Sequence, residues 1–308
     1  MNQTRFGQTG FNVTPLGFGA AQIGYLNTDR QLASKILNFL LDEGVNVIDT
    51  ASGYETSEEV VGESIAHRRD QFVLISKCGN TLPDISAPRW SAQLITETID
   101  RSLKRLKTDR IDVMLLHSCD QRTLQTGQAL AALVKAKEAG KIRFAGYSGD
   151  NETAAYAAGL PDVSVIETSV SIADQANIDL VLPIARKNNL GVIAKRPIAN
   201  AAWKEISSQP SFYKEYARTY TERLAAMKLS PAALGIPGPP QTAWPELALR
   251  FTLSQEGVNT AIIGSTRLDN ARSNISYANK GPLAPSIVQQ IRKAFNAAQG
   301  TQRWTGQT

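Results

Sequence analysis

Residues that commonly bind metals are scarce in this sequence. The 308-residue chain has two cysteines, Cys78 and Cys119, and two histidines, His67 and His117. Zinc centres need more of these ligands at closer spacing, and two isolated cysteines do not form a disulfide framework. We therefore predict no metal site. Isolated thiols in a cytoplasmic protein usually stay reduced, and a redox switch between the two is the alternative interpretation.

Long hydrophobic runs are absent as well. No apolar segment is long enough to span a membrane, and the polar residues 1–5 lead into patterned sequence without the apolar core of a signal peptide. We therefore predict a cytoplasmic protein without membrane association. The net charge is only +5, and the basic residues are dispersed. This small excess suits an anionic cofactor, and we predict no nucleic-acid partner.

Short apolar segments alternate with amphipathic segments along most of the chain. Eight of the apolar segments have the composition of parallel strands covered on both faces, namely residues 16–19, 45–49, 72–76, 111–117, 142–147, 163–168, 191–194 and 260–263. Helical periodicity marks the intervening residues 29–43, 91–106 and 123–139. This repetition favours a closed barrel over an open doubly wound sheet, so we predict one (β/α)8 TIM-barrel domain over residues 1–308.

Three segments fall outside the repeat. Residues 3–15 predict a small β-hairpin that turns at residues 8–10 and covers the N-terminal end of the barrel. Residues 199–243 are long and contain a proline-rich stretch, which is typical of a functional loop or lid. Residues 285–298 predict an extra C-terminal helix, which is followed by a tail over residues 304–308.

Four polar residues lie at the ends of three consecutive predicted strands. Asp49 ends the second strand, and Tyr54 follows it five residues later. Lys77 ends the third strand, and His117 ends the fourth. Each of these residues alone is commonly structural, but the carboxyl ends of barrel strands share the face where TIM-barrel active sites lie. We therefore expect the four side chains to converge.

The chemistry of these four groups is coherent. A phenol has a pKa of about 10 and is a poor acid at neutral pH, but a neighbouring ammonium stabilises its phenolate. A carboxylate fixes the ammonium, and an imidazole orients a carbonyl oxygen towards the phenol. This combination suits protonation of a carbonyl group while a cofactor delivers hydride.

Further pieces of sequence accompany these residues in a fixed order. They are Asp49-Thr50-Ala51-x-x-Tyr54, Ser57-Glu58-Glu59-x-x-Gly62, Ser76-Lys77, Leu115-Leu116-His117, Arg143-Phe144-Ala145-Gly146-Tyr147-Ser148, Ala248-Leu249-Arg250-Phe251 and Ile262-Ile263-Gly264-Ser265-Thr266-Arg267, with Asn274 downstream. Together they cover nearly the whole chain and resemble the aldo-keto reductase family. The resemblance implies NADPH-dependent reduction of a small aldehyde or ketone, with Tyr54 as general acid and with Asp49, Lys77 and His117 as its support.

The resemblance also places the nicotinamide end of the cofactor. Ser148 matches a residue that holds the carboxamide, and Glu167 stands where the family commonly has a glutamine. A carboxylate can still accept a hydrogen bond from the amide. Many relatives place an aromatic residue against the ring where this chain has Lys195, which Arg196 follows. We also include Gly19 and Ala20, at the end of the first strand, among the predicted cofactor contacts.

The segment after the eighth predicted strand resembles the adenosine site. It comprises Gly264, Ser265, Thr266 and Arg267, and a helix begins directly after it. Backbone amides at a helix start favour anions, and an arginine can fork onto a phosphate. The resemblance places the adenosine 2′-phosphate here, with Asn270 and Asn274 near the adenine. Many relatives have a further arginine where this chain has Asn270, so we expect a moderate preference for NADPH.

Two other functions fit parts of the pattern. Some aldo-keto reductase relatives serve as cofactor-binding regulatory or channel-associated subunits, and these can retain the four polar residues. A phosphate-binding isomerase on the same fold would share the anion site but would not need the four residues together. The candidates for the substrate pocket are aromatic, namely Tyr25, Trp90, Trp203 and Trp304. The physiological substrate and the oligomeric state stay open.

Overall fold

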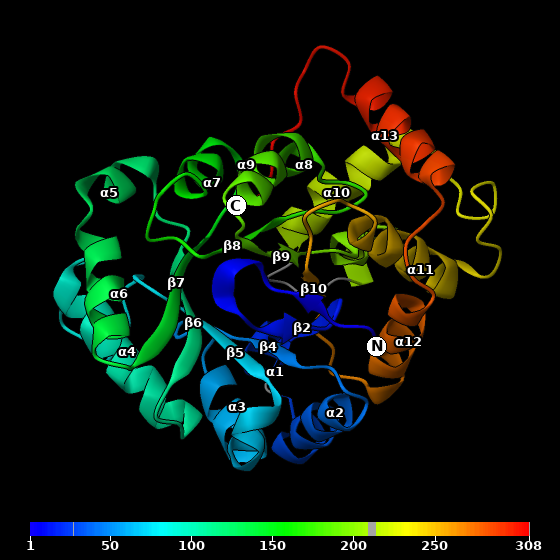
Figure 1. The fold of residues 1–308 in the computed structure, drawn as a ribbon. Coiled ribbons are helices and arrows are strands. Elements are labelled where there is room, and N and C mark those ends of the chain that lie inside the picture. Colours follow the sequence, from blue (N-terminus) through cyan, green and yellow to red (C-terminus); the bar gives the residue numbers. More distant parts are fainter. Residues whose placement is uncertain (27, 209–213, 308) are drawn as a thin grey trace.

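Eight parallel strands close into a barrel at the centre of the protein (Figure 1). The computed structural model describes residues 1–26, 28–208 and 214–307. The barrel strands are β3 (Leu16–Gly19), β4 (Val47–Asp49), β5 (Val73–Cys78), β6 (Ile111–His117), β7 (Ile142–Ser148), β8 (Val165–Ser169), β9 (Gly191–Lys195) and β10 (Thr260–Ile262). The predicted barrel is confirmed, and every predicted strand is present. That residues 1–308 form one domain stays a prediction.

The alternation of side chains along the strands decides what points into the barrel. Val73, Val113 and Val165 belong to the cluster that fills the interior, whereas Leu74 and Met114 pack outward against the helices. Successive side chains of a strand face opposite sides. The same register therefore turns the later odd-numbered residues inward at the C-terminal end of the barrel, namely Asp49, Lys77, His117, Glu167 and Lys195.

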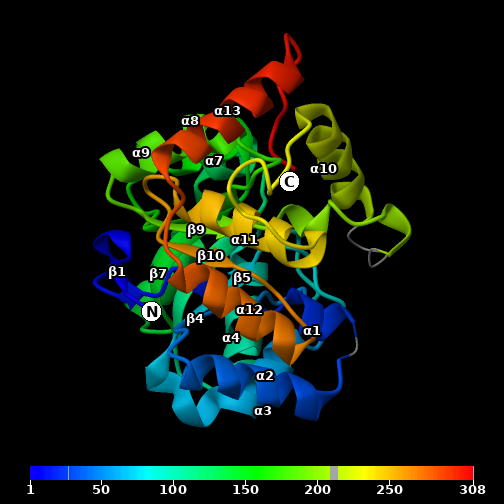
Figure 2. The same cartoon turned by 90° about the vertical axis from the view of Figure 1, so that its right-hand side faces the viewer.

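A hairpin covers the opposite end of the barrel. Its strands are β1 (Thr4–Arg5) and β2 (Asn12–Val13), which pair in antiparallel orientation around a short 3₁₀ turn. Phe6 is fully buried in the interior cluster, and the backbone N–H of Gln8 donates to the carbonyl oxygen of Asn189 at 2.8 Å. Figure 2 shows the hairpin and helices α1 and α10 at opposite sides of the barrel. The predicted plug is confirmed, which leaves the C-terminal end as the open one.

Helices surround the barrel. They are α1 (Ala21–Tyr25), α2 (Arg30–Asp42), α3 (Ser57–Ile65), α4 (Ala92–Leu106), α5 (Gln121–Thr126), α6 (Gln128–Glu138), α7 (Asn151–Ala157), α8 (Ala176–Leu180), α9 (Leu182–Lys187), α10 (Lys214–Met227), α11 (Pro240–Leu253), α12 (Leu268–Asn279) and α13 (Pro285–Gln299). Asp29 caps α2 and Ser91 caps α4 through their side-chain oxygens. The predicted C-terminal helix is confirmed as α13.

One prediction about the helices was wrong, and one segment predicted as a loop or lid contains a helix. Residues 123–139 form two helices instead of one, because Gly127 adopts a left-handed conformation with φ of 71° between α5 and α6. Glycine has no Cβ, so this break costs little, and the apolar spacing continues across it. Residues 199–243 are not a plain loop, since they include α10, whose Tyr220 and Leu224 pack in one cluster with Phe295 of α13. Residues 209–213 and Thr308 of the predicted tail lie outside the described residues.

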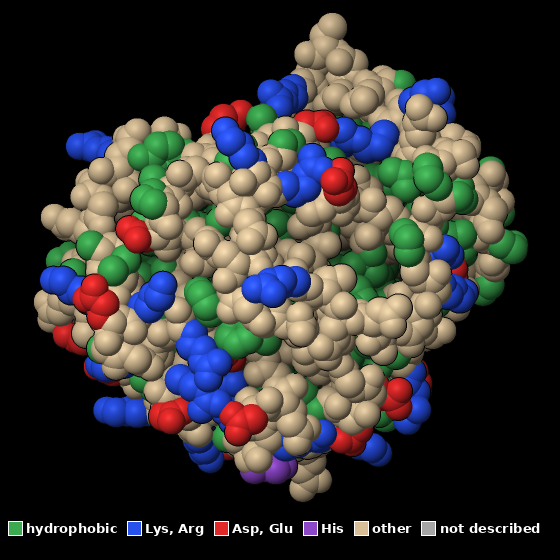
Figure 3. All heavy atoms as spheres, in the orientation of Figure 1, with side chains coloured by type: hydrophobic (Ala, Val, Ile, Leu, Met, Phe, Trp, Pro, Cys, Tyr) green, Lys and Arg blue, Asp and Glu red, His purple; other side chains and the backbone are tan. Residues whose placement is uncertain are grey.

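Charge is mixed on the face that the hairpin covers. Figure 3 shows Lys and Arg side chains scattered there with Asp and Glu among them. Near this end, Arg69 Nη2 lies 2.7 Å from Asp112 Oδ2, and Arg143 Nε lies 3.5 Å from Asp112 Oδ1. Within the described ranges, no helix combines the length and apolar character needed to cross a membrane.

Candidate active site

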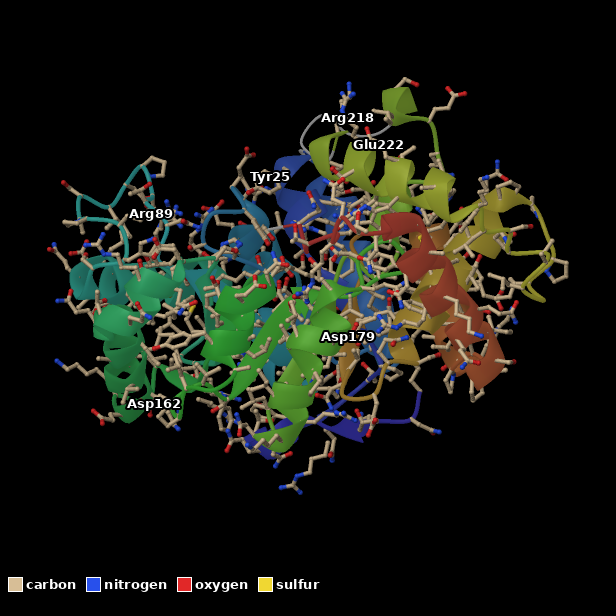
Figure 4. All side chains as sticks on the ribbon, turned by 90° about the horizontal axis from the view of Figure 1, so that it is seen from above. Tyr25, Arg89, Asp162, Asp179, Arg218 and Glu222 are labelled. Carbon is tan, nitrogen blue, oxygen red and sulfur yellow. The ribbon has the colours of Figure 1, made fainter. Side chains whose placement is uncertain are left out.

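A cleft of about 920 Å³ opens at the C-terminal end of the barrel. Figure 4 shows Tyr25 and Arg89 towards this end and Asp162, which precedes β8, towards the other. Most of the predicted site residues line the cleft, namely Gly19, Asp49, Tyr54, His117, Ser148, Glu167, Lys195, Arg196, Gly264, Ser265, Thr266, Asn270 and Asn274. The structure therefore brings most of the predicted site residues to one cleft, and their catalytic and cofactor-binding roles stay predictions.

Asp49, Tyr54, Lys77 and His117 meet at the bottom of the cleft. Lys77 Nζ donates to Asp49 Oδ1 at 2.5 Å and to the carbonyl oxygen of Thr50 at 3.0 Å. The same ammonium lies 5.2 Å from the centre of the Tyr54 ring. The His117 ring stands edge-on to Tyr54, with ring centres 5.7 Å apart and planes at 77°. A phenol thus lies between an ammonium and an imidazole.

Tight local turns hold Tyr54 in this position. Its N–H donates to the carbonyl oxygen of Ala51 at 3.0 Å, and its own carbonyl oxygen accepts from the N–H of Ser57 at 2.8 Å. Helix α1 approaches so closely that a Cβ on Gly24 would lie 2.2 Å from the Tyr54 carbonyl oxygen. Only glycine fits at this contact, and the Tyr25 ring beside it lies 5.5 Å from that of Tyr54.

Burial and charge set the protonation of the cluster. Burial lowers the pKa of Lys77, but the negative charges of Asp49 and Glu167 outweigh it and raise the pKa overall, so the side chain is an ammonium. Burial, followed by the positive charges of Lys77, Lys195 and Arg89, lowers the pKa of His117 to about 3. The imidazole is therefore neutral at neutral pH and can donate one hydrogen bond.

Comparisons with known proteins show the family of the chain. The family model described as aldo/keto reductase family matches residues 15–296. The chain belongs to the aldo/keto reductase family.

Individual relatives extend the match over whole chains. An uncharacterized oxidoreductase of Bacillus subtilis is 27% identical over 95% of this chain and 96% of its own. An NADH-specific methylglyoxal reductase of Escherichia coli is 25% identical over 91% of this chain and 94% of its own. The holo form of an aldo-keto reductase from Bacillus halodurans superposes with a TM-score of 0.79 and 25% identity, over 98% of this chain and 99% of its own. This aldo-keto reductase is therefore an NAD(P)H-dependent oxidoreductase.

Three predicted residues of the aldo-keto reductase are not among the described residues that line the cleft. Lys77 is fully buried beneath its floor, and Ala20 is buried behind its wall, where its N–H donates to the Asp49 carbonyl oxygen at 2.7 Å. Arg267 is exposed at the start of α12, and its N–H donates to Ser265 Oγ at 3.0 Å. Ala20 and Lys77 can therefore support the residues that line the cleft, whereas Arg267 can meet a ligand only at its outer edge.

Sequence reasoning missed Asp150, a buried acid two residues after β7. Asp150 Oδ2 lies 2.9 Å from Lys195 Nζ, and its other oxygen accepts from the N–H of Ser169 at 2.7 Å. Arg196 donates to Ser169 Oγ at 3.3 Å and to the carbonyl oxygen of Gln307. The two cations beside the cleft are therefore already held by groups of the protein. Its position just after a strand end was the available signal for Asp150.

The aromatic predictions are divided. Tyr25 and Trp203 line the cleft. Trp90 instead lies under the Arg89 guanidinium, and Trp304 packs edge-on against Phe295. Residues that sequence reasoning did not single out also line the cleft, including Ser118, Ile198 and Tyr277.

Strained backbone and a buried amide without a partner among the described residues lie at the cleft after β9. Ala199, Asn200 and Ala201 follow β9 with φ values of 45°, 50° and 55°, a left-handed run that costs each residue roughly 1–2 kcal/mol. Such strain persists where function requires it. Asn200 Nδ2 is buried and has no hydrogen-bond partner among the described residues. A Cβ on Gly264 would lie 2.6 Å from the Gly19 carbonyl oxygen, so glycine is required where the ends of the neighbouring strands β3 and β10 meet at the cleft.

Both cysteines are shielded from chemistry at the site. Cys78 and Cys119 are free and buried, and burial is the main cause that raises the pKa of Cys119 to about 12 and that of Cys78 as well. Because the thiolate is the reactive form, we predict that both thiols stay free after mild oxidation of the native protein. Mass spectrometry checks this, with the unfolded protein as the reactive control. A disulfide between them in the native protein would establish the redox interpretation.

Proposed function

We propose that this aldo-keto reductase reduces small aldehydes or ketones to alcohols with NADPH, in the cytoplasm, and with Tyr54 as the proton donor. The observation that carries the proposal is the position of the Tyr54 phenol, between the Lys77 ammonium and the neutral His117 imidazole at the bottom of the cleft. A bound nicotinamide cofactor supplies hydride.

Each side chain has a distinct part in the proposed proton transfer. The Tyr54 hydroxyl donates its proton to the carbonyl oxygen of the substrate. The Lys77 ammonium stabilises the phenolate that remains, and Asp49 holds that ammonium at 2.5 Å. His117, neutral through the physiological range, donates a hydrogen bond to the same carbonyl oxygen and orients it towards the phenol.

The same cleft provides groups for the cofactor. Ser148 and Glu167 would meet the carboxamide, and Lys195 and Arg196 would lie beside the ring. The backbone from Gly264 to Thr266, the first amides of α12 and the Asn200 amide would meet phosphates. Asn270 and Asn274 would border the adenine, and Arg267 would reach the 2′-phosphate.

A carbonyl substrate panel with NADPH tests the proposal. Oxidation of NADPH that depends on an added aldehyde or ketone supports it, and is followed by loss of the cofactor absorbance. Tight NADPH binding without turnover of any carbonyl would favour a regulatory or channel-associated subunit. Failure to bind either nicotinamide cofactor, measured by fluorescence titration, would favour a phosphate-binding barrel enzyme of another kind.

The preference for NADPH over NADH is a separate prediction. The two cofactors differ by one phosphate, so a group that meets this phosphate carries the discrimination. A charged hydrogen bond contributes roughly 1.5–3 kcal/mol, which is about a ten- to hundredfold effect. Arg267→Ala should therefore raise the KM for NADPH by about that factor and leave the KM for NADH nearly unchanged.

A matched control for this prediction is Arg122→Ala. Arg122 is also an exposed arginine beside a helix start, in the first turn of α5, and it does not line the cleft. Steady-state kinetics with both cofactors should show no change for this variant. If Arg267→Ala raises both KM values equally, Arg267 holds the fold or the shared pyrophosphate and does not select the cofactor.

A further inference from the structure

A second carboxylate reaches the Lys77 ammonium. Glu167 on β8 places Oε2 3.3 Å from Lys77 Nζ, and the side chains are 3% and 0% exposed. Its other oxygen, Oε1, accepts from Ser148 Oγ at 3.2 Å. Oε2 is buried and has no hydrogen-bond partner among the described residues, so the ammonium is the group it faces. Glu167 therefore contacts the catalytic cluster as well as the cofactor cleft.

The ammonium is shared between two strands. Asp49 on β4 holds Lys77 Nζ at 2.5 Å, and Glu167 approaches it from the opposite side of the barrel interior. The two carboxylates also affect each other: burial first, and the charge of Glu167 second, raise the pKa of Asp49. The Lys77 ammonium thus attracts two carboxylates at once. The site contains little water, so each of these electrostatic interactions is strong.

We propose that Glu167 is a positioning residue of the active site, which shares the Lys77 ammonium with Asp49 and so weakens the stabilisation that this ammonium gives to the Tyr54 phenolate. The inference rests on the proposed function for its catalytic meaning. Its physical content, a negative charge that acts on Tyr54 through Lys77, is independent of turnover.

The sign of the effect follows from electrostatics. A negative charge nearby disfavours phenolate and favours the protonated phenol. Tyr54 therefore keeps its proton to a higher pH with Glu167 than it would with a neutral amide in the same place. A phenol that stays protonated is ready to donate, so Glu167 extends the pH range of carbonyl reduction upward and works against the reverse reaction, in which Tyr54 must accept a proton.

Several other ionisable or charged groups surround Tyr54 and must stay constant in a test. The groups in contact with it or with its neighbours are Tyr25 on α1, Asp49 on β4, Lys77 on β5 and His117 on β6. The charges of Arg89 and of Lys195 on β9, which pairs with Asp150, act on His117. His117 is neutral throughout the alkaline range, and Lys195 is paired with Asp150. Replacement of Glu167 by glutamine leaves all of these groups in place.

The experiment is a titration of Tyr54 in the protein without cofactor. The phenolate absorption of each protein is recorded against pH, and subtraction of the same protein with Tyr54→Phe isolates Tyr54 from the other tyrosines. Glu167→Gln, which keeps the size and an oxygen able to accept from Ser148, should lower the titration midpoint of Tyr54 by about one pH unit. The alkaline limb of the rate profile for carbonyl reduction should move down by the same amount.

Glu58→Gln is the matched control. Glu58 is also a buried glutamate that accepts from a serine, since Ser76 Oγ donates to its Oε1 at 2.8 Å. It lies on the outward side of β5, in the helix layer, whereas Lys77 points inward. The control repeats the chemical change and leaves the charge around Tyr54 as it was, so its titration midpoint should equal that of the unmodified protein.

The outcomes separate this inference from the proposed function. A lower midpoint in Glu167→Gln supports the inference even if no carbonyl compound is turned over, a result that would defeat only the proposed function. An unchanged midpoint overturns the inference. A change in NADPH affinity without any change in the Tyr54 midpoint also overturns it, because Glu167 would then be a contact to the carboxamide alone.

Discussion

Replacement of Tyr54 by phenylalanine should lower kcat for carbonyl reduction by about 10²–10⁴-fold, the range that one general acid contributes. The change removes a single oxygen atom. The ring keeps its edge-on contact with His117 and its place above Lys77, so the cleft keeps its shape. The affinity for NADPH, measured by fluorescence titration, should therefore stay within a few-fold of the unmodified value.

Tyr25→Phe is the control for the loss of a phenol near the site. The Tyr25 hydroxyl donates to the carbonyl oxygen of Gly53 at 3.1 Å, and its ring lies 5.5 Å from that of Tyr54. The hydroxyl proton of Tyr25 is engaged by the Gly53 carbonyl oxygen and is not available to a substrate, while the ring lines the cleft. Removal of this hydroxyl should therefore alter KM more than kcat. Near-normal turnover in Tyr54→Phe would assign the proton to another donor. An equal loss in both variants would point to disruption of the loop between them.

The strand pattern made most of the site predictable. Parallel strands buried on both faces are continuously apolar, so a polar residue at a strand end is conspicuous, as are Asp49 and His117. Two-residue alternation then turns both inward with Lys77. Lys77 is followed by one more residue of β5, because the pairing with β6 continues through Cys78. The sequence thus indicates the ends of a strand only weakly, whereas it indicates strongly which face of the strand a side chain points to.

Contacts between distant segments could not be predicted. The charge of Lys195 is held by Asp150, forty-five residues earlier in the chain, and neither residue has a local pattern that identifies the other. Glu167 was assigned only to the cofactor, since its approach to Lys77 depends on how far the barrel closes between β5 and β8. Helix α10 could not be predicted for a related reason. Its apolar face packs against α13, which lies much later in the sequence.

Replacement of Lys77 by methionine should abolish most turnover and also destabilise the fold. The phenolate of Tyr54 loses the cation that stabilises it, so kcat should fall by about 10²–10⁴-fold. Asp49 and Glu167 are left as two buried carboxylates without an ammonium, and breaking a buried ion pair costs about 3–5 kcal/mol of unfolding free energy. Urea unfolding measures this loss, and the activity is compared per folded molecule.

The pH dependence of that stability identifies its cause. Without the ammonium, burial raises the carboxyl pKa values of the folded state above those of the unfolded chain. The folded state then binds more protons, so the unfolding free energy of Lys77→Met should fall as pH rises through and above the ordinary carboxyl range of about 4.

A triple variant separates stability from catalysis. Lys77→Met combined with Asp49→Asn and Glu167→Gln carries no stranded charge, so most of the lost stability should return and its pH dependence should flatten. Turnover should not return, because the cation beside the phenol is still missing. If the triple variant recovers activity together with stability, Lys77 only supports the fold. If Lys77→Met alone keeps the original rate and pH profile, Lys77 has no part in the mechanism.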